Sequence, residues 1–270
     1  MNPSAPPDRR GRFAMRLFDA HNHLQDPRFG GRQEEIVRTC REAGIVRMVV
    51  HGTGEADWPA VAGLARRHPD LVIPAFGLHP WQVGGRSSGW REQLVGFLDA
   101  FPGAVVGEIG LDRWMLEEPD RWRAHLGPRG ASWVPASLEE QQDVFEEQLG
   151  LARQRGRPAC LHCLRAWGRL QEALGPAGGP GRGVLLHSYG GPAERVPGLA
   201  RQGAYFGFSG WFLHPRKRRQ LEVFRRVPPD RLLVETDAPD QPLPVEWRRP
   251  LPSGEPGAAY NHPAQLSGVY

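Results

Sequence analysis

Short apolar runs recur along the chain and alternate with longer amphipathic segments. Eight of the runs have the length and composition of a buried strand, at residues 15–18, 47–51, 71–76, 104–108, 158–162, 183–187, 204–209 and 231–235. Segments with helical periodicity lie between them, at residues 33–43, 57–68, 89–101, 137–155, 164–174, 192–202 and 215–227. The pattern therefore predicts strands and helices in regular alternation.

Local signals support several of these boundaries. Gly44 follows the first helical segment, where glycine suits the left-handed conformation beyond a helix end. Ser137 and Glu140 have the spacing of a capping box. Residues 113–136 contain prolines and tryptophans without a clear period, so we predict a long loop insertion there.

Alternation of strands and helices predicts parallel pairing, and eight strands predict a closed (β/α)8, TIM-like barrel. An open doubly wound sheet is the fallback, although no glycine-rich nucleotide fingerprint follows the first strand. After Asp237 no final helix is evident, so we expect the last helix to be truncated. That truncation would leave apolar surface on the first and last strands exposed, in a less stable monomer or a weak dimer.

Composition narrows the class of protein. Hydrophobic residues make up 40% of the 270 residues and charged residues 24%, which allows a large core. Residues 1–14 resemble a disordered leader, and residues 15–270 are expected to form a single domain. The chain has three cysteines without framework spacing and no apolar run of about 18 residues. We therefore expect free thiols, no membrane span and a cytoplasmic location. The net charge of +4 is compatible with an anionic substrate.

Polar residues of metal-binding type recur where the predicted strands end. They are His21, His23, Glu108, His162, His187 and Asp237. One such histidine is more often a structural residue, and one such carboxylate often caps a helix. Six at the same end of a barrel would repel one another and resist burial unless cations compensate them. The set therefore predicts two divalent ions and a hydrolytic reaction, while the bond that is cleaved stays open.

Six motifs resemble those of TatD-type metal-dependent hydrolases, which belong to the amidohydrolase superfamily and include deoxyribonucleases. In chain order they read FDAHNH from Phe18, GLHP from Gly77, GEIGLD from Gly107, LHC from Leu161, LHSYGG from Leu186 and ETDAP from Glu235. The resemblance covers roughly residues 16 to 266. It implies a barrel enzyme that cleaves DNA phosphodiester bonds with the help of two divalent ions, Mg, Mn or Zn.

The resemblance also implies a role for individual residues. One ion would be held by His21, His23, Glu108 and Asp237, and the second by Glu108, His162 and His187. Asp237 would take the proton from the attacking water, and Glu108 would bridge the ions. His79 at the rim and Arg165 would bind substrate. Asp112 and Glu235 would lie next to the metal ligands and orient them without binding an ion themselves.

The chain departs from the family pattern at several positions. Trp81 stands where a second histidine is usual, Leu164 separates Arg165 from the His-Cys pair, and Asp240 with Gln241 replaces a tyrosine. Trp81, Trp114, Trp133 and Trp211 fall in segments expected near the mouth, where they would stack on bases or simply pack loops. The basic run at 216–219 would meet phosphates or form a solvated helix face.

Two other functions are compatible with the same pattern. A two-metal amidohydrolase would act on a C–N or ester bond of a small molecule. A lysine on the fourth strand would favour that branch, but the position holds Glu108. A non-enzymatic remnant is the third possibility, which the complete ligand set argues against.

Overall fold

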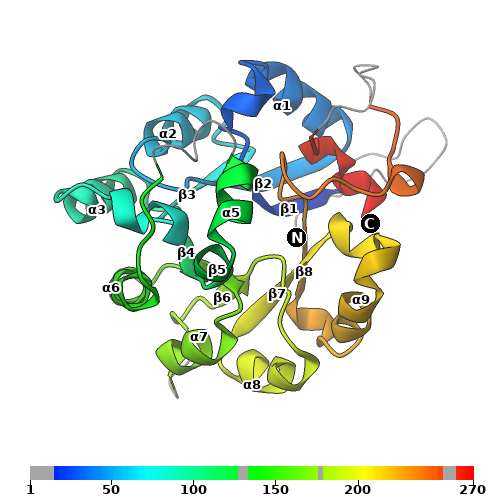
Figure 1. Ribbon diagram of the computed structural model, residues 1–270. Coiled ribbons are helices and arrows are strands. Elements are labelled where there is room, and N and C mark those ends of the chain that lie inside the picture. Colours follow the sequence, from blue (N-terminus) through cyan, green and yellow to red (C-terminus); the bar gives the residue numbers. More distant parts are fainter. Residues whose placement is uncertain (1–14, 127–132, 176–178, 252–259) are drawn as a thin grey trace.

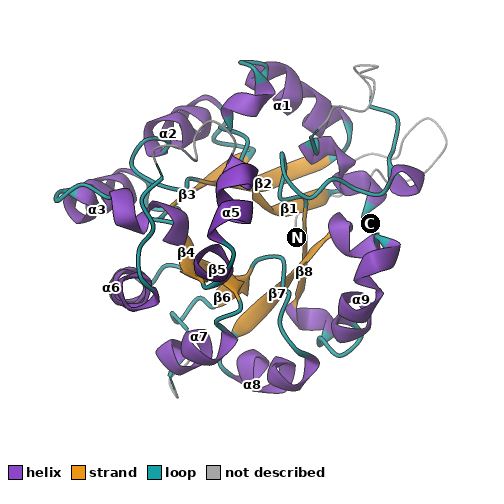
Figure 2. Ribbon diagram, viewed as in Figure 1, coloured by secondary structure: helices purple, strands orange, loops and turns teal. Residues whose placement is uncertain are grey.

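The computed structural model describes residues 15–126, 133–175, 179–251 and 260–270, so the leader predicted at 1–14 lies outside it. Eight strands form one sheet in the order β1 to β8, and each pair of neighbours along this order is parallel. The strands lie at the centre of the molecule and the helices surround them (Figures 1 and 2). The predicted (β/α)8 barrel is confirmed.

Each predicted run overlaps one strand. The strands are β1 (Leu17–Asn22), β2 (Ile45–His51), β3 (Val72–Phe76), β4 (Val105–Asp112), β5 (Ala159–Leu164), β6 (Val184–Leu186), β7 (Ala204–Ser209) and β8 (Leu232–Glu235). Three strands, β1, β4 and β5, continue beyond the predicted ends. The predicted runs end early there because a polar residue interrupts each of them, Asp19 in β1, Glu108 in β4 and His162 in β5.

The α-helices follow the strands around the barrel. They are α1 (Gln33–Glu42), α2 (Trp58–Arg67), α3 (Trp90–Ala100), α4 (Trp114–Glu117), α5 (Pro119–Leu126), α6 (Leu138–Gln154), α7 (Trp167–Leu174), α8 (Val196–Arg201) and α9 (Arg218–Phe224). The capping box of Ser137 and Glu140 opens α6 as predicted. None of the helices in the described part of the chain combines the length and hydropathy that a membrane crossing requires.

The barrel closes between its last and first strands without a regular ladder of the kind seen between the other neighbours. Two backbone hydrogen bonds bridge the gap just past the end of β8. The Asp237 amide donates to the His21 carbonyl at 2.9 Å, and the His23 amide donates to the Ala238 carbonyl at 2.7 Å. Buried Asp19 of β1 also accepts hydrogen bonds from the amide and the hydroxyl of Thr236. The closure therefore fixes the end of β8 against the end of β1.

The predicted loop insertion at 113–136 is partly wrong, because it contains α4 and α5. Both helices are short, so no periodicity stands out in the sequence. Buried Met115 and Trp122 anchor them, and Pro119 opens α5, a position that proline favours. In the view of Figure 1, α5 lies inside the ring of outer helices, over the strands.

The prediction for the end of the chain is corrected in part. No α-helix follows β8 among the described residues, which have two short 3-10 helices there, η8 (Val245–Trp247) and η9 (Pro263–Gly268). However, η9 packs against α1 and β1, and its Leu266 is fully buried. The outer side of β1 is therefore covered, whereas Leu232 of β8 stays 38% exposed. The predicted oligomeric state stays a prediction.

This packing makes η9 a structural element of the barrel. We expect Leu266→Ala to lower the free energy of unfolding by about 2–5 kcal/mol, because it leaves a cavity against β1 and α1. Denaturant unfolding followed by circular dichroism measures the change. The matched control is Val245→Ala, since Val245 is 74% exposed and its truncation should change stability by less than about 0.5 kcal/mol. Equal, small effects of both substitutions would contradict the structural role of η9.

Candidate metal centre

The end of β1 supplies two imidazoles to one point. His21 and His23 are separated by one residue, so both project to the same side of the strand. Their Nε2 atoms lie 3.2 Å apart, and His21 is fully buried. Two nitrogens this close cannot both carry a proton toward each other. A cation between them would satisfy both lone pairs.

Glu108 of β4 lies at the centre of the cluster and is 2% exposed. Its Oε2 atom is 3.3 Å from His21 Nε2 and 3.5 Å from His23 Nε2. Its Oε1 atom is 3.2 Å from His162 Nδ1 and 3.3 Å from His187 Nε2. The two oxygens of one carboxylate thus face two different sets of histidines.

Asp237 completes the first set. It follows β8, and the hydrogen bond of its amide to the His21 carbonyl holds it beside β1. Its Oδ1 atom is 3.4 Å from His21 Nε2 and 3.6 Å from His23 Nε2. Its Oδ2 atom accepts a hydrogen bond of 2.6 Å from the Gln241 amide group. All six residues predicted as metal ligands therefore lie together at the carboxyl end of the barrel.

A second layer of acceptors stands behind these histidines. Asp112 Oδ2 is 3.1 Å from His162 Nε2, and Glu235 Oε1 is 3.2 Å from His187 Nδ1. Glu235 also accepts hydrogen bonds from the amide and hydroxyl of Ser188. Asp112 and Glu235 thus each contact the ring nitrogen that points away from Glu108. Such contacts fix the orientation and tautomer of a metal-ligating histidine.

His79 lies deeper than the predicted position at the rim. It is 1% exposed, and its Nε2 is 3.4 Å from Glu108 Oε1. Its Nδ1 accepts a hydrogen bond from the Trp81 amide as the chain enters the 3-10 helix η2 (Pro80–Gly85). The proton therefore resides on Nε2, which donates toward Glu108. This tautomer makes His79 a hydrogen-bond donor at the site. The ligand atoms of His79, Glu108 and His162 also lie within 4.8 Å of one another, close enough to share one metal ion.

Arg165 is not directed at the cluster. It is half exposed, and its guanidinium forms an ion pair of 2.7 Å with Glu117 of α4.

The tryptophans predicted near the mouth differ in the residues that they contact. Trp81 donates a 2.7 Å hydrogen bond to Asp112 and lies 4.2 Å, centroid to centroid, from the buried Trp122. On the opposite side of the barrel, Trp211 is covered by Arg216 at 4.4 Å.

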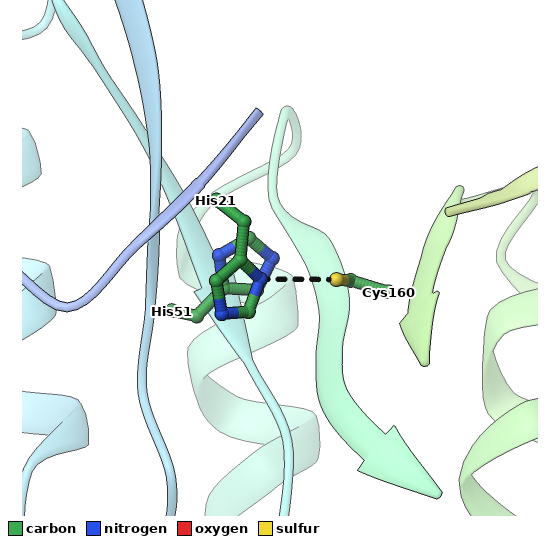
Figure 3. Close-up of side chains that lie close together, drawn as sticks. All are labelled: His21, His51 and Cys160. Carbon is green, nitrogen blue, oxygen red and sulfur yellow. Dashed lines mark hydrogen bonds between the residues drawn. The ribbon is translucent and has the colours of Figure 1, made fainter. Parts of the chain in front are cut away.

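Two buried residues that the sequence analysis did not select complete the surroundings of His21. Cys160 of β5 has its Sγ atom 3.3 Å from His21 Nδ1, and the imidazole of His51 stacks on that of His21 at 4.0 Å (Figure 3). His51 does end a predicted strand, the same signal that marked the ligands. All three cysteines are free thiols, as predicted.

Charge distribution in the cluster is unusual for a buried site. Within the described residues, Glu108 and Asp237 form ion pairs with histidines and with no lysine or arginine. Burial raises the pKa of Glu108, yet the imidazoles of His187, His79 and His21 outweigh it and hold that pKa well below its usual range. Both carboxylates therefore stay ionised at neutral pH, and Asp237 has a lowered pKa for similar reasons.

The pKa values of two histidines in the cluster shift in opposite directions. Burial opposes the charged form of His162, but its contacts with Asp112 and Glu108 raise its pKa to about 9. Burial lowers the pKa of His79 to about 4, so this residue is neutral. Imidazole nitrogens and carboxylate oxygens are ligands that suit divalent ions of borderline hardness, and four histidines with two carboxylates are enough for two of them. The donor set therefore fits divalent metal ions.

Comparisons with known proteins agree with this chemistry. The chain is 31% identical over 230 residues to an uncharacterized metal-dependent hydrolase, YjjV, of Escherichia coli strain K12, with 84% of this chain and 81% of the relative covered. It is 31% identical over 224 residues to the 3'-5' ssDNA/RNA exonuclease TatD of Edwardsiella piscicida, with 83% and 79% covered.

A solved structure of the same Escherichia coli YjjV, a TatD homolog, superposes on the chain with a TM-score of 0.75. The superposition covers 94% of this chain and 87% of that one at 29% identity. A family model described as TatD related DNase matches residues 18–270. These matches confirm the predicted resemblance and the class of metal-dependent hydrolase, and the chain therefore belongs to the TatD related DNase family.

Proposed function

We propose that the protein hydrolyses phosphodiester bonds of single-stranded nucleic acid, using a water molecule activated between two divalent ions. The observation that carries this proposal is the position of Glu108, whose two oxygens face two separate sets of histidines. A carboxylate in that position can bridge two ions, and a pair of ions suits an in-line displacement at phosphorus. Relatives named as 3'-5' ssDNA/RNA exonucleases support the choice of substrate.

The distances within the cluster support two ligand sets. His21, His23 and Asp237 would hold the first ion together with Glu108 Oε2. His162 and His187 would hold the second together with Glu108 Oε1. Four imidazoles favour Zn²⁺ over Mg²⁺, which prefers oxygen ligands.

Asp237, Gln241 and His79 would each have a separate role in the hydrolysis. Bound divalent ions would lower the pKa of a water molecule and neutralise charge on the phosphate oxygens. Asp237 is ionised at neutral pH and would take the proton of the attacking water. Gln241 holds the other carboxylate oxygen of Asp237 and so orients it. Neutral His79 presents an N–H that would also donate to a phosphate oxygen of the substrate.

Features around the mouth are compatible with a nucleic-acid strand. Trp81 and Trp114 are partly exposed on the α4–α5 side, and Trp211 with Arg216 lies after β7. Aromatic rings and arginines of this kind stack on bases and neutralise phosphates of single strands. The alternative, hydrolysis of a C–N or ester bond in a small molecule, would use the same metal site but would leave the partly exposed tryptophans and Arg216 at the mouth without a role.

Removal of the bridging carboxylate gives the first test of the proposal. We expect Glu108→Gln to weaken binding of both ions and to lower nuclease activity by at least about 100-fold, since an outer contact alone contributes about 10–100-fold. Hydrolysis of a labelled single-stranded oligonucleotide, with and without EDTA, measures activity. Glu139→Gln is the matched control, because Glu139 lies on the exposed face of α6. Undiminished hydrolysis in EDTA would refute the two-ion proposal.

The pKa of His162 gives a second prediction. A protonated imidazole has no lone pair for a metal, so protons compete with the second ion. Since the pKa of His162 is raised to about 9, we expect metal affinity to increase with pH up to about 9 and then to level off. Asp112→Asn removes a contact that raises this pKa, so the rise should shift to lower pH. Competition with a chromogenic chelator across this range measures both profiles, and identical profiles would contradict the assignment.

A further inference from the structure

Each histidine proposed as a metal ligand has one ring nitrogen toward the carboxylates and the other toward a supporting group. Three supporting atoms are oxygens. They are the His51 carbonyl, 2.8 Å from His23 Nδ1, and the carboxylates of Asp112 and Glu235. His21 differs, because its Nδ1 contacts the sulfur of Cys160 at 3.3 Å.

The ring of His21 is held in its plane from both sides. The imidazole of His51 stacks on one face at a centroid distance of 4.0 Å and an angle of 21°, and that of His187 stacks on the other at 4.0 Å and 20°. Rotation about the Cβ–Cγ bond would drive the ring through these neighbours. The stack therefore fixes the plane, but it does not select which nitrogen of His21 carries the proton.

Cys160 can make that selection. If the thiol donates to Nδ1, the proton of the ring resides on Nε2 and blocks the position beside Glu108 and Asp237. If Nδ1–H donates to the sulfur, Nε2 keeps its lone pair for a metal ion. Cys160 is 1% exposed, and the sulfur of a thiol is a weak but usable hydrogen-bond acceptor.

We propose that Cys160 is a positioning residue, whose sulfur accepts the Nδ1–H of His21 and so holds Nε2 ready for the first ion. Figure 3 shows the thiol of Cys160 beside the edge of the His21 ring, with the ring of His51 overlapping that of His21 in this view. This inference rests on the proposed function, because it assumes that His21 binds an ion. It assigns to a buried cysteine the supporting task that oxygen atoms perform for the other three histidines.

Substitutions of different chemistry at residue 160 test the proposal. Cys160→Val keeps the approximate size but removes the acceptor, and we expect about 10–100-fold weaker binding of the more affected ion. Cys160→Ser keeps an acceptor and should restore most of the affinity. Cys163→Val is the matched control, since Cys163 is a second buried thiol of β5 and belongs to the hydrophobic core. Titration with Zn²⁺ against a competing chelator gives the dissociation constants, and thermal unfolding of the metal-free variants reports on folding.

A loss of affinity in Cys160→Val with recovery in Cys160→Ser supports the positioning role. Equal affinity in the valine variant and the unmodified protein, or an equal loss in both variants, would overturn it. If the valine variant does not fold, nitrogen-15 NMR of the histidines decides the matter in the unmodified protein. We expect the proton on Nδ1 of His21 in the metal-free protein, at a pH where the ring is neutral, and a proton on Nε2 there would refute the proposal. His21→Ala distinguishes failure of the positioning role from failure of the proposed function. Unchanged binding of both ions in that variant would contradict the proposed function itself.

Discussion

Two ionised carboxylates lie buried among four imidazoles at the carboxyl end of the barrel, and no lysine or arginine of the described chain pairs with either carboxylate. Burial of charge without a strong partner is costly in a protein interior. Contacts between the histidine nitrogens and the carboxylate oxygens offset part of this cost. Divalent ions would offset it more fully and would leave each imidazole neutral, so the site favours metal binding on electrostatic grounds.

The barrel brings these groups together from distant parts of the sequence. Parallel strands place their carboxyl ends on one face, where His21 of β1, Glu108 of β4 and His162 of β5 converge. The hydrogen bonds between β1 and the chain beyond β8 bring Asp237 to the same point. The contacts that close the barrel therefore also position Asp237 in the site. A defect in closure would remove a proposed ligand as well as stability.

Much of this arrangement could be predicted from the sequence, because strand ends and residue spacing carry the information. The alternation of apolar runs predicts the barrel, and the recurrence of His, Glu and Asp where these runs end predicts the cluster. Other features depend on tertiary contacts and leave no local signal. The helices α4 and α5 are too short to show a period, and the depth of His79 follows from its hydrogen bond to the Trp81 amide. The contact between Cys160 and His21 joins residues 139 positions apart.

The central claim is that Glu108 bridges two ions. Anomalous X-ray diffraction from crystals grown with Mn²⁺ or Zn²⁺ tests it most directly. We predict two anomalous peaks, one on each side of the Glu108 carboxylate, each about 2.0–2.2 Å from its imidazole ligands. A single peak, or peaks that lie away from Glu108, would contradict the account.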